Sequence, residues 1–210
     1  MLYLQISDHL FNSYCRAAFM HNMLSFDVTD YEIPGHLLKT SCREGEACIG
    51  TILPVIGLRY PNETVRLSMA NRRAPHWLFD EIIQLTLKGC LSFDIHLRNG
   101  STVNIFKLDM DLSAHMSALI ENSKVFSEII DLNFTTSKIR GKIFQSNFNF
   151  TNLLRMVDTV VRNSIIPKIN EQGRIGLPLI LMDGASLQST SLKVGKRCLI
   201  IGTNFHIDFI

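Results

Sequence analysis

Residues 83–116 read IQLTLKGCLSFDIHLRNGSTVNIFKLDMDLSAHM. Apolar and polar side chains alternate toward both ends of this stretch, which is the pattern of strands with one apolar face. Asn99 and Gly100 lie between the two ends and tolerate the positive φ of a tight hairpin turn. The sequence therefore predicts a long β-hairpin, with arms of about 15 residues where a typical strand has about 5–6. Such a hairpin belongs to a twisted antiparallel sheet whose apolar side needs a cover.

Apolar periodicity predicts the other elements. We expect helices over residues 4–23, 49–59 and 152–171 and further strands over 24–29, 65–70, 77–79, 125–135, 138–144, 179–187 and 198–209. Thr136-Ser137 and residues 193–196 are predicted to be turns. Pro167 is expected to kink or break the third helix near its last turn, because proline lacks a backbone donor and clashes with the preceding turn.

Composition predicts a single globular domain over residues 1–210, since 46% of the residues are hydrophobic and 19% are charged. The 21 basic and 19 acidic residues nearly balance without a dense Lys/Arg block, which argues against nucleic-acid binding. We expect no transmembrane segment, because no apolar run reaches the length of about 18 residues that a spanning helix needs. The opening residues also lack the basic region of a signal peptide.

The five cysteines form no CxxC unit and the seven histidines form no HxxxH pair, so we expect neither a metal nor a cofactor. Cys42 and Cys48 could close a small loop as a disulfide. Four sequons give a mild indication of a secretory route. The predicted glycosylation sites are Asn62, Asn99, Asn133 and Asn149.

The helix predicted over residues 152–171 carries an apolar stripe, and a stripe of this kind most often packs into the core. A sheet of five strands is roughly 24 Å wide, whereas a helix is about 10 Å across, so two helices barely cover the sheet, and a gap between helix and sheet would be apolar. An apolar gap accepts an apolar ligand. From the first and third predicted helices we therefore select, as candidate lipid-lining residues, Leu10, Phe11, Tyr14, Leu153, Val157, Val160, Val161 and Ile165.

Charged residues leave two further alternatives open. Lys138, Arg140 and Lys142 alternate along one strand and could meet anionic headgroups or lipopolysaccharide phosphates, although a solvated strand face is the favoured explanation because three charges are a small patch. Asp109 and Asp111 resemble the start of a calcium loop, but their spacing fits the wet face of a strand better. No GxSxG, P-loop or GxGxxG motif occurs, so the chain is predicted not to be an enzyme, while a hydrolase site built from distant residues stays a minority alternative.

Four stretches, in the same order, resemble a known family. They are residues 3–13 (YLQISDHLFNS), residues 53–62 (LPVIGLRYPN), the long hairpin, and residues 166–179 (IPKINEQGRIGLPL). Together they resemble the C-terminal domain of the family of bactericidal/permeability-increasing protein (BPI), lipopolysaccharide-binding protein and phospholipid transfer protein. One departure is Gly173, which stands where that family usually keeps an apolar residue in its long helix.

The resemblance implies an α+β fold in which a long, highly twisted antiparallel sheet wraps around a long helix, with a second helix beside it, as a BPI-type C-terminal barrel. It also implies a secreted, extracellular protein with an apolar pocket for acyl chains and an N-terminal BPI domain as partner in the full-length product. We therefore expect non-enzymatic binding of phospholipid or a similar acyl lipid, with a role in lipid transfer or innate-immune lipid recognition. The alternative is a protein- or lipopolysaccharide-interaction module without stable lipid cargo.

Overall fold

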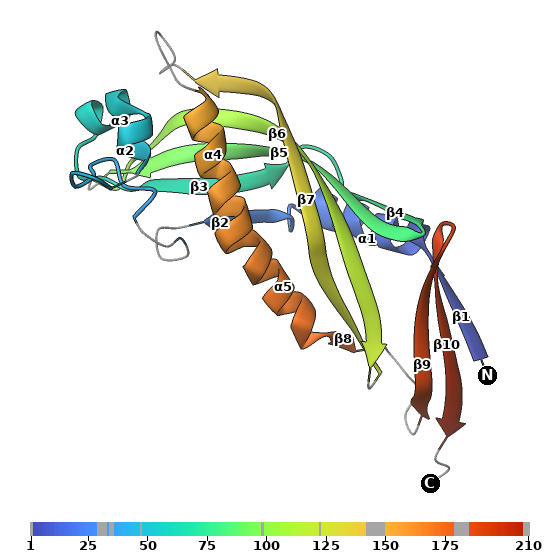
Figure 1. The fold of residues 1–210 in the computed structure, drawn as a ribbon. Coiled ribbons are helices and arrows are strands. Elements are labelled where there is room, and N and C mark those ends of the chain that lie inside the picture. Colours follow the sequence, from blue (N-terminus) through green and yellow to red (C-terminus); the bar gives the residue numbers. More distant parts are fainter. Residues whose placement is uncertain are drawn as a thin grey trace.

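The computed structural model describes residues 2–28, 33, 36–46, 48–97, 99–121, 123–141, 150–178 and 185–207 (Figure 1). The helical elements are α1 (Asp8–Met20), α2 (Ile49–Ile52), α3 (Pro54–Arg59), α4 (Phe150–Val160), the π-helical turn η1 (Val161–Ile165) and α5 (Ile166–Ile175). The strands are β1 (Leu2–Ser7), β2 (Ser25–Val28), β3 (Val65–Asn71), β4 (His76–Asp80), β5 (Ile82–His96), β6 (Thr102–Glu121), β7 (Lys124–Gly141), β8 (Leu177–Pro178), β9 (Ala185–Gly195) and β10 (Cys198–Ile207).

The strands form two antiparallel sheets. The large sheet has the order β2-β3-β5-β6-β7-β8, with β4 also paired to β5, and the small sheet has the order β1-β10-β9. The predicted α+β class and the long twisted sheet are thus confirmed (Figure 1). In the part of the chain that the structure describes, no strand joins β2 to β8, so the expected barrel is an open sheet.

The predicted hairpin is the centre of the large sheet. Leu87 pairs with Leu112 and Leu91 pairs with Leu108, so that the apolar residues of both arms share one face. Its arms, β5 and β6, have 15 and 20 residues. The main core lies between this face and the helix that runs from α4 to α5, where Phe93 and Phe106 are fully buried and stack on each other.

The predicted helix over residues 4–23 is wrong at its start, because residues 2–7 form strand β1. This strand pairs with β10 from Leu2–Thr203 to Ser7–Cys198. The helix begins only at Asp8, whose buried carboxylate is held by Arg197 at 3.2 Å. A partner strand nearly 200 residues away therefore overrides the local apolar pattern.

Three other boundaries need correction. The helix predicted over 49–59 divides at Leu53, whose backbone (φ −126°, ψ 74°) is not helical, in keeping with the steric restriction that Pro54 places on the residue before it. The strands predicted over 125–135 and 138–144 are the single strand β7, in which Ser137 is the extra residue of a β-bulge rather than part of a turn. The turn predicted at residues 193–196 is instead formed by Lys196 and Arg197. Strand β9 continues to Gly195, which pairs with Cys198 on β10. Residues 142–144 and 179–184 lie outside the described residues.

Pro167 does not end the long helix. The π-helical turn η1 precedes it, and α5 continues to Ile175. A π turn widens the helix locally, which gives the proline ring space that a regular turn would deny it. The long helix crosses the large sheet at α4 and then runs beside strand β7 at α5 (Figure 1).

Candidate functional site

The apolar side of α4 is packed into the core. Leu153, Val157, Val160 and Val161 have at most 5% of their surface exposed, and Ile165 is partly buried against the same cluster. These five candidate residues therefore line the interface between helix and sheet, and their side chains fill much of it.

The candidates on α1 lie elsewhere. Phe11 packs on Trp77 and Phe79, in a second apolar cluster with Leu199. Leu10 and Tyr14 point outward and are 60% and 70% exposed. The eight candidate residues are thus not brought together in one pocket, and their contact with lipid stays a prediction.

A groove lies on another side of α4, between this helix and strand β7. Its volume is about 590 Å³, and it is widely open to solvent. Its lining combines two apolar side chains with polar and charged ones: Asn133, Phe134, Thr151, Leu154, Arg155, Asp158, Thr159 and Arg162. The groove therefore has an amphipathic lining.

The charged side of the groove comes from one face of the helix. Arg155, Asp158 and Arg162 follow at spacings of three and four residues, which places them side by side. Arg162 donates to the Asp158 carboxylate at 2.8 Å and to the Leu132 carbonyl at 3.2 Å. Arg155 is exposed and makes no ion pair with any residue that the structure describes. Two guanidinium groups against one carboxylate leave this side with a net positive charge.

Further along β7 the same helix closes tightly on the strand. The Ile129 amide donates to Asn170 Oδ1 at 2.7 Å, and Asn170 Nδ2 donates to the Ile129 carbonyl at 3.2 Å. A Cβ on Gly173 would lie 2.0 Å from the Ser127 carbonyl oxygen, so only glycine permits this approach. The residue that departs from the family pattern thus makes close packing possible.

The cysteines separate into one disulfide and three thiols. Cys42 and Cys48 form the disulfide that their spacing suggested, while Cys15, Cys90 and Cys198 are free. Burial raises the pKa of the Cys15 thiol, and a hydrogen bond from Trp77 offsets this in part. Burial raises the pKa of Cys90 as well, with the neighbouring Asp109 adding to the effect. Neither thiol is activated as a nucleophile.

Within the described residues no three His, Cys, Asp or Glu side chains are grouped as a metal site would require. None of the described helices is both long and apolar enough to cross a bilayer. Of the four sequon asparagines, Asn62, Asn99 and Asn133 are exposed, and Asn149 lies outside the described residues. Asn99 is at the tip of the long hairpin, whereas Asn133 borders the groove.

Residues 1–207 match the family described as "LBP / BPI / CETP family, C-terminal domain". The chain belongs to the LBP / BPI / CETP family. The resemblance inferred from the sequence is confirmed over almost the whole chain.

Relatives in this family are considerably longer. The lipopolysaccharide-binding protein of Bos taurus is 25% identical over 208 residues, which are 97% of this chain and 42% of that protein. The bactericidal permeability-increasing protein of Sebastes schlegelii is 24% identical over 209 residues, with the same coverage of both chains. A crystal structure of lipopolysaccharide binding protein superposes with a TM-score of 0.62 at 20% identity, covering 99% of this chain and 43% of that one. The chain thus spans about two fifths of the length of these relatives.

The groove was not predicted from the sequence, although a signal for it existed. Arg155, Asp158 and Arg162 lie outside the apolar stripe of the helix and are spaced three and four residues apart. This spacing places the three side chains on one face of α4 and so indicates a second, charged side of the helix that can meet the sheet edge. No sequence pattern predicts that Phe134 lines the groove, since its position opposite this face depends on where the helix crosses β7.

Proposed function

We propose that this LBP / BPI / CETP-family domain binds an amphipathic lipid, of the phospholipid or lipopolysaccharide class, without covalent chemistry. The observation that carries the proposal is the groove beside α4, in which Phe134 and Leu154 offer apolar surface and Arg155 and Arg162 offer positive charge. An acyl chain would lie on the apolar residues, and an anionic headgroup would meet the guanidinium groups.

Two physical terms support this assignment. Each buried CH₂ of an acyl chain contributes about 0.8 kcal/mol, so that part of one chain is enough for measurable binding. Guanidinium groups bind phosphate through paired hydrogen bonds, which fixes the headgroup at the mouth of the groove. The name of one relative, lipopolysaccharide-binding protein, agrees with this ligand class.

The finer parts of the proposal follow from the family. The domain would act outside the cell, glycosylated and joined to an N-terminal domain, in lipid transfer or in innate-immune recognition of lipid. The candidate residues at the interface of α4 with the sheet would then line the inner end of the lipid site, if an acyl chain enters between helix and sheet from the groove.

A second function, contact with another protein domain, is favoured by the surface of β1 and α1. Tyr3, Leu10 and Tyr14 are each at least 60% exposed there, although they are large and largely apolar. The N-terminal domain of the longer product is the first partner to consider for this surface, and it would leave the groove beside α4 free.

The test combines lipid extraction with filling of the groove. Purified protein is extracted with organic solvent for lipid mass spectrometry, and uptake of a fluorescent phospholipid from vesicles is measured. Thr159→Trp should fill the groove and reduce uptake, whereas Asn163→Trp, an exposed position on the same long helix outside the groove, should not. Thermal melts show that both variants are folded.

A charge reversal tests the headgroup. Arg155→Glu should weaken uptake from anionic vesicles more than from neutral ones, and Arg16→Glu on α1 is the matched control. Absence of stoichiometric lipid in the extract, together with no uptake by this chain or by the longer product, would refute lipid binding and favour the protein-contact function.

A further inference from the structure

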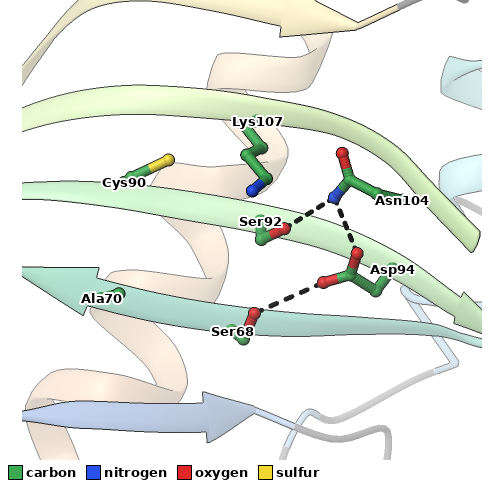
Figure 2. Close-up of a pocket in the computed structure, with 7 residues that line it drawn as sticks. All are labelled: Ser68, Ala70, Cys90, Ser92, Asp94, Asn104 and Lys107. Carbon is green, nitrogen blue, oxygen red and sulfur yellow. Dashed lines mark hydrogen bonds between the residues drawn. The ribbon is translucent and has the colours of Figure 1, made fainter. Parts of the chain in front are cut away.

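A polar hollow lies on the face of the large sheet that is turned away from α4 (Figure 2). Its volume is about 390 Å³, and its lining comes from three adjacent strands: Ser68 and Ala70 on β3, Cys90, Ser92 and Asp94 on β5, and Asn104 and Lys107 on β6. The hollow is therefore separate from the groove of the proposed function, and no part of the lipid argument depends on it.

A β-bulge assembles this hollow. Phe93 pairs with Phe106 and Asp94 pairs with Asn104, so that Ile105 is the extra residue. In a regular strand Asn104 and Lys107, three positions apart, would point to opposite faces. Because of the bulge, both line the same hollow while Ile105 and Phe106 are buried.

One end of the hollow is a hydrogen-bonded cluster around Asp94. Asn104 Nδ2 donates to Asp94 Oδ1 and to Ser92 Oγ, both at 2.7 Å, and Ser68 Oγ donates to Asp94 Oδ2 at 3.4 Å (Figure 2). No cation of the described chain is within ion-pair distance of Asp94. A carboxylate has about four acceptor positions, so Asp94 keeps acceptor capacity toward the hollow. The Asn104 carbonyl oxygen points away from these partners (Figure 2).

The other end of the hollow is positive. Among the described residues Lys107 has no ion-pair partner, and its amine extends toward Ser92 (Figure 2). Beside it, the buried Asp109 carboxylate is held by Arg72 at 2.8 Å and by Arg140 at 2.5 Å. The second guanidinium leaves this cluster with one net positive charge. Arg140 reaches the edge of the hollow, since its Nη2 is 3.6 Å from Cys90 Sγ.

The Cys90 thiol adds no negative charge beside Lys107 and Arg140. Burial and the neighbouring Asp109 raise the pKa of Cys90, so the side chain stays neutral at physiological pH. The hollow thus presents Lys107 at one end, with Arg140 at its edge. The other end presents the acceptors of Asp94 and Asn104 and the Ser92 hydroxyl, which accepts from Asn104 and can still donate its own proton.

We propose that this hollow binds a small phosphorylated sugar or polyol. The phosphate would contact Lys107 and Arg140, while hydroxyl groups of the ligand would donate to Asp94 and Asn104 and accept from Ser92. A carboxylate next to an amide offers acceptors that adjacent hydroxyl groups can reach together. Ammonium and guanidinium groups supply the charge-assisted hydrogen bonds that phosphate prefers. A free sugar would leave the positive end unused, and Asp94 would repel a free phosphate.

Calorimetric titration with three probes tests the proposal: glucose 6-phosphate, glucose and inorganic phosphate. We expect glucose 6-phosphate to bind tightest, and its affinity to fall as salt is added. Lys107→Met should weaken its binding about 10- to 100-fold, the loss expected for a hydrogen bond to a charged group. Lys193→Met, an exposed lysine on the small sheet, should leave the affinity unchanged.

Asp94→Ala separates the two ends of the hollow. It should weaken glucose 6-phosphate and strengthen inorganic phosphate, because the repelling carboxylate is gone. The proposal is overturned if glucose 6-phosphate shows no binding at millimolar concentration, if inorganic phosphate binds equally well, or if Lys107→Met behaves like Lys193→Met. Far-UV circular dichroism and melts of each variant show whether a loss comes from unfolding, and in that case Lys107→Gln and Asp94→Asn replace them. Since the titration uses no lipid, failure of this proposal leaves the proposed lipid function untouched.

Discussion

The two ends of the long helix meet the same strand, β7, in different ways. At α5, Asn170 bonds both backbone groups of Ile129, and Gly173 lets the helix touch the strand at Ser127. At α4, Arg162 donates to the Leu132 carbonyl of the strand, and a groove lined by Arg155 and Arg162 remains. An amide and a glycine therefore allow close packing of the helix on the sheet edge at α5, whereas at α4 the helix face toward the strand carries long charged side chains and a groove remains.

Asn170→Leu should remove the hydrogen bonds between α5 and β7 and cause the largest loss of stability. The substitution leaves the Ile129 amide and carbonyl without their partner in a buried place, and each such group costs about 1–3 kcal/mol. We expect a loss of about 3 kcal/mol in the free energy of unfolding, measured by urea denaturation. Gln172→Leu, exposed on the same helix, should change stability little. Equal losses in both variants would contradict the role of Asn170.

Val160 and Thr159 are adjacent on α4 and differ in the space around them. Val160 is 2% exposed in the core, so Val160→Trp should overpack it and cost about 1–3 kcal/mol. Thr159→Trp enters the groove and should change stability by less than about 0.5 kcal/mol. Thermal melts compare the two variants. If Val160→Trp left stability unchanged and removed bound lipid, then the interface of helix and sheet would itself be the lipid pocket.

Gly173→Ala should lower the stability of the protein, although a glycine-to-alanine change in a helix usually raises it. Alanine normally stabilises a helix interior by about 1 kcal/mol relative to glycine. Here its Cβ would lie 2.0 Å from the Ser127 carbonyl oxygen, so helix and strand must move apart. We expect a net loss of about 1 kcal/mol, with Gln172→Ala as the neutral control. A gain in stability would show that the packing of α5 on β7 tolerates a wider spacing.

The central part of the fold could be predicted because its signals are local. Alternation and the Asn99-Gly100 turn predict β5 and β6, and the apolar stripe predicts the long helix. Strand β1 was missed because its partner, β10, lies at the far end of the chain. Strand β7 was divided at Thr136-Ser137 because a bulge and a turn both use polar residues there.

The candidate site could be predicted only in part. The stripe from Leu153 to Ile165 identifies the buried side of the long helix, but periodicity does not distinguish a filled interface from a pocket. The outward position of Leu10 and Tyr14 depends on how α1 packs on β4, which no local pattern contains. The polar hollow depends on one extra residue in β6, and the position of a bulge is not visible in the alternation of a single strand.

The smallest expected effect concerns a glycan at the open end of the helix. Asn133 borders the groove and is exposed, and it carries the sequon Asn133-Phe134-Thr135. If the protein is expressed through a secretory route, a glycan at this site would partly cover the groove entrance and slow the entry of lipid. Asn133→Gln should then raise the rate of fluorescent phospholipid uptake a few-fold without changing the amount bound at equilibrium.

Asn99→Gln is the control for this prediction. It removes a glycan of the same kind at the distant hairpin tip and should leave the rate unchanged. Glycopeptide mass spectrometry establishes that both sites are occupied before the rates are compared. Because the closely packed end near Asn170 offers no entrance, equal rates in the two variants would mean that lipid does not enter between α4 and β7.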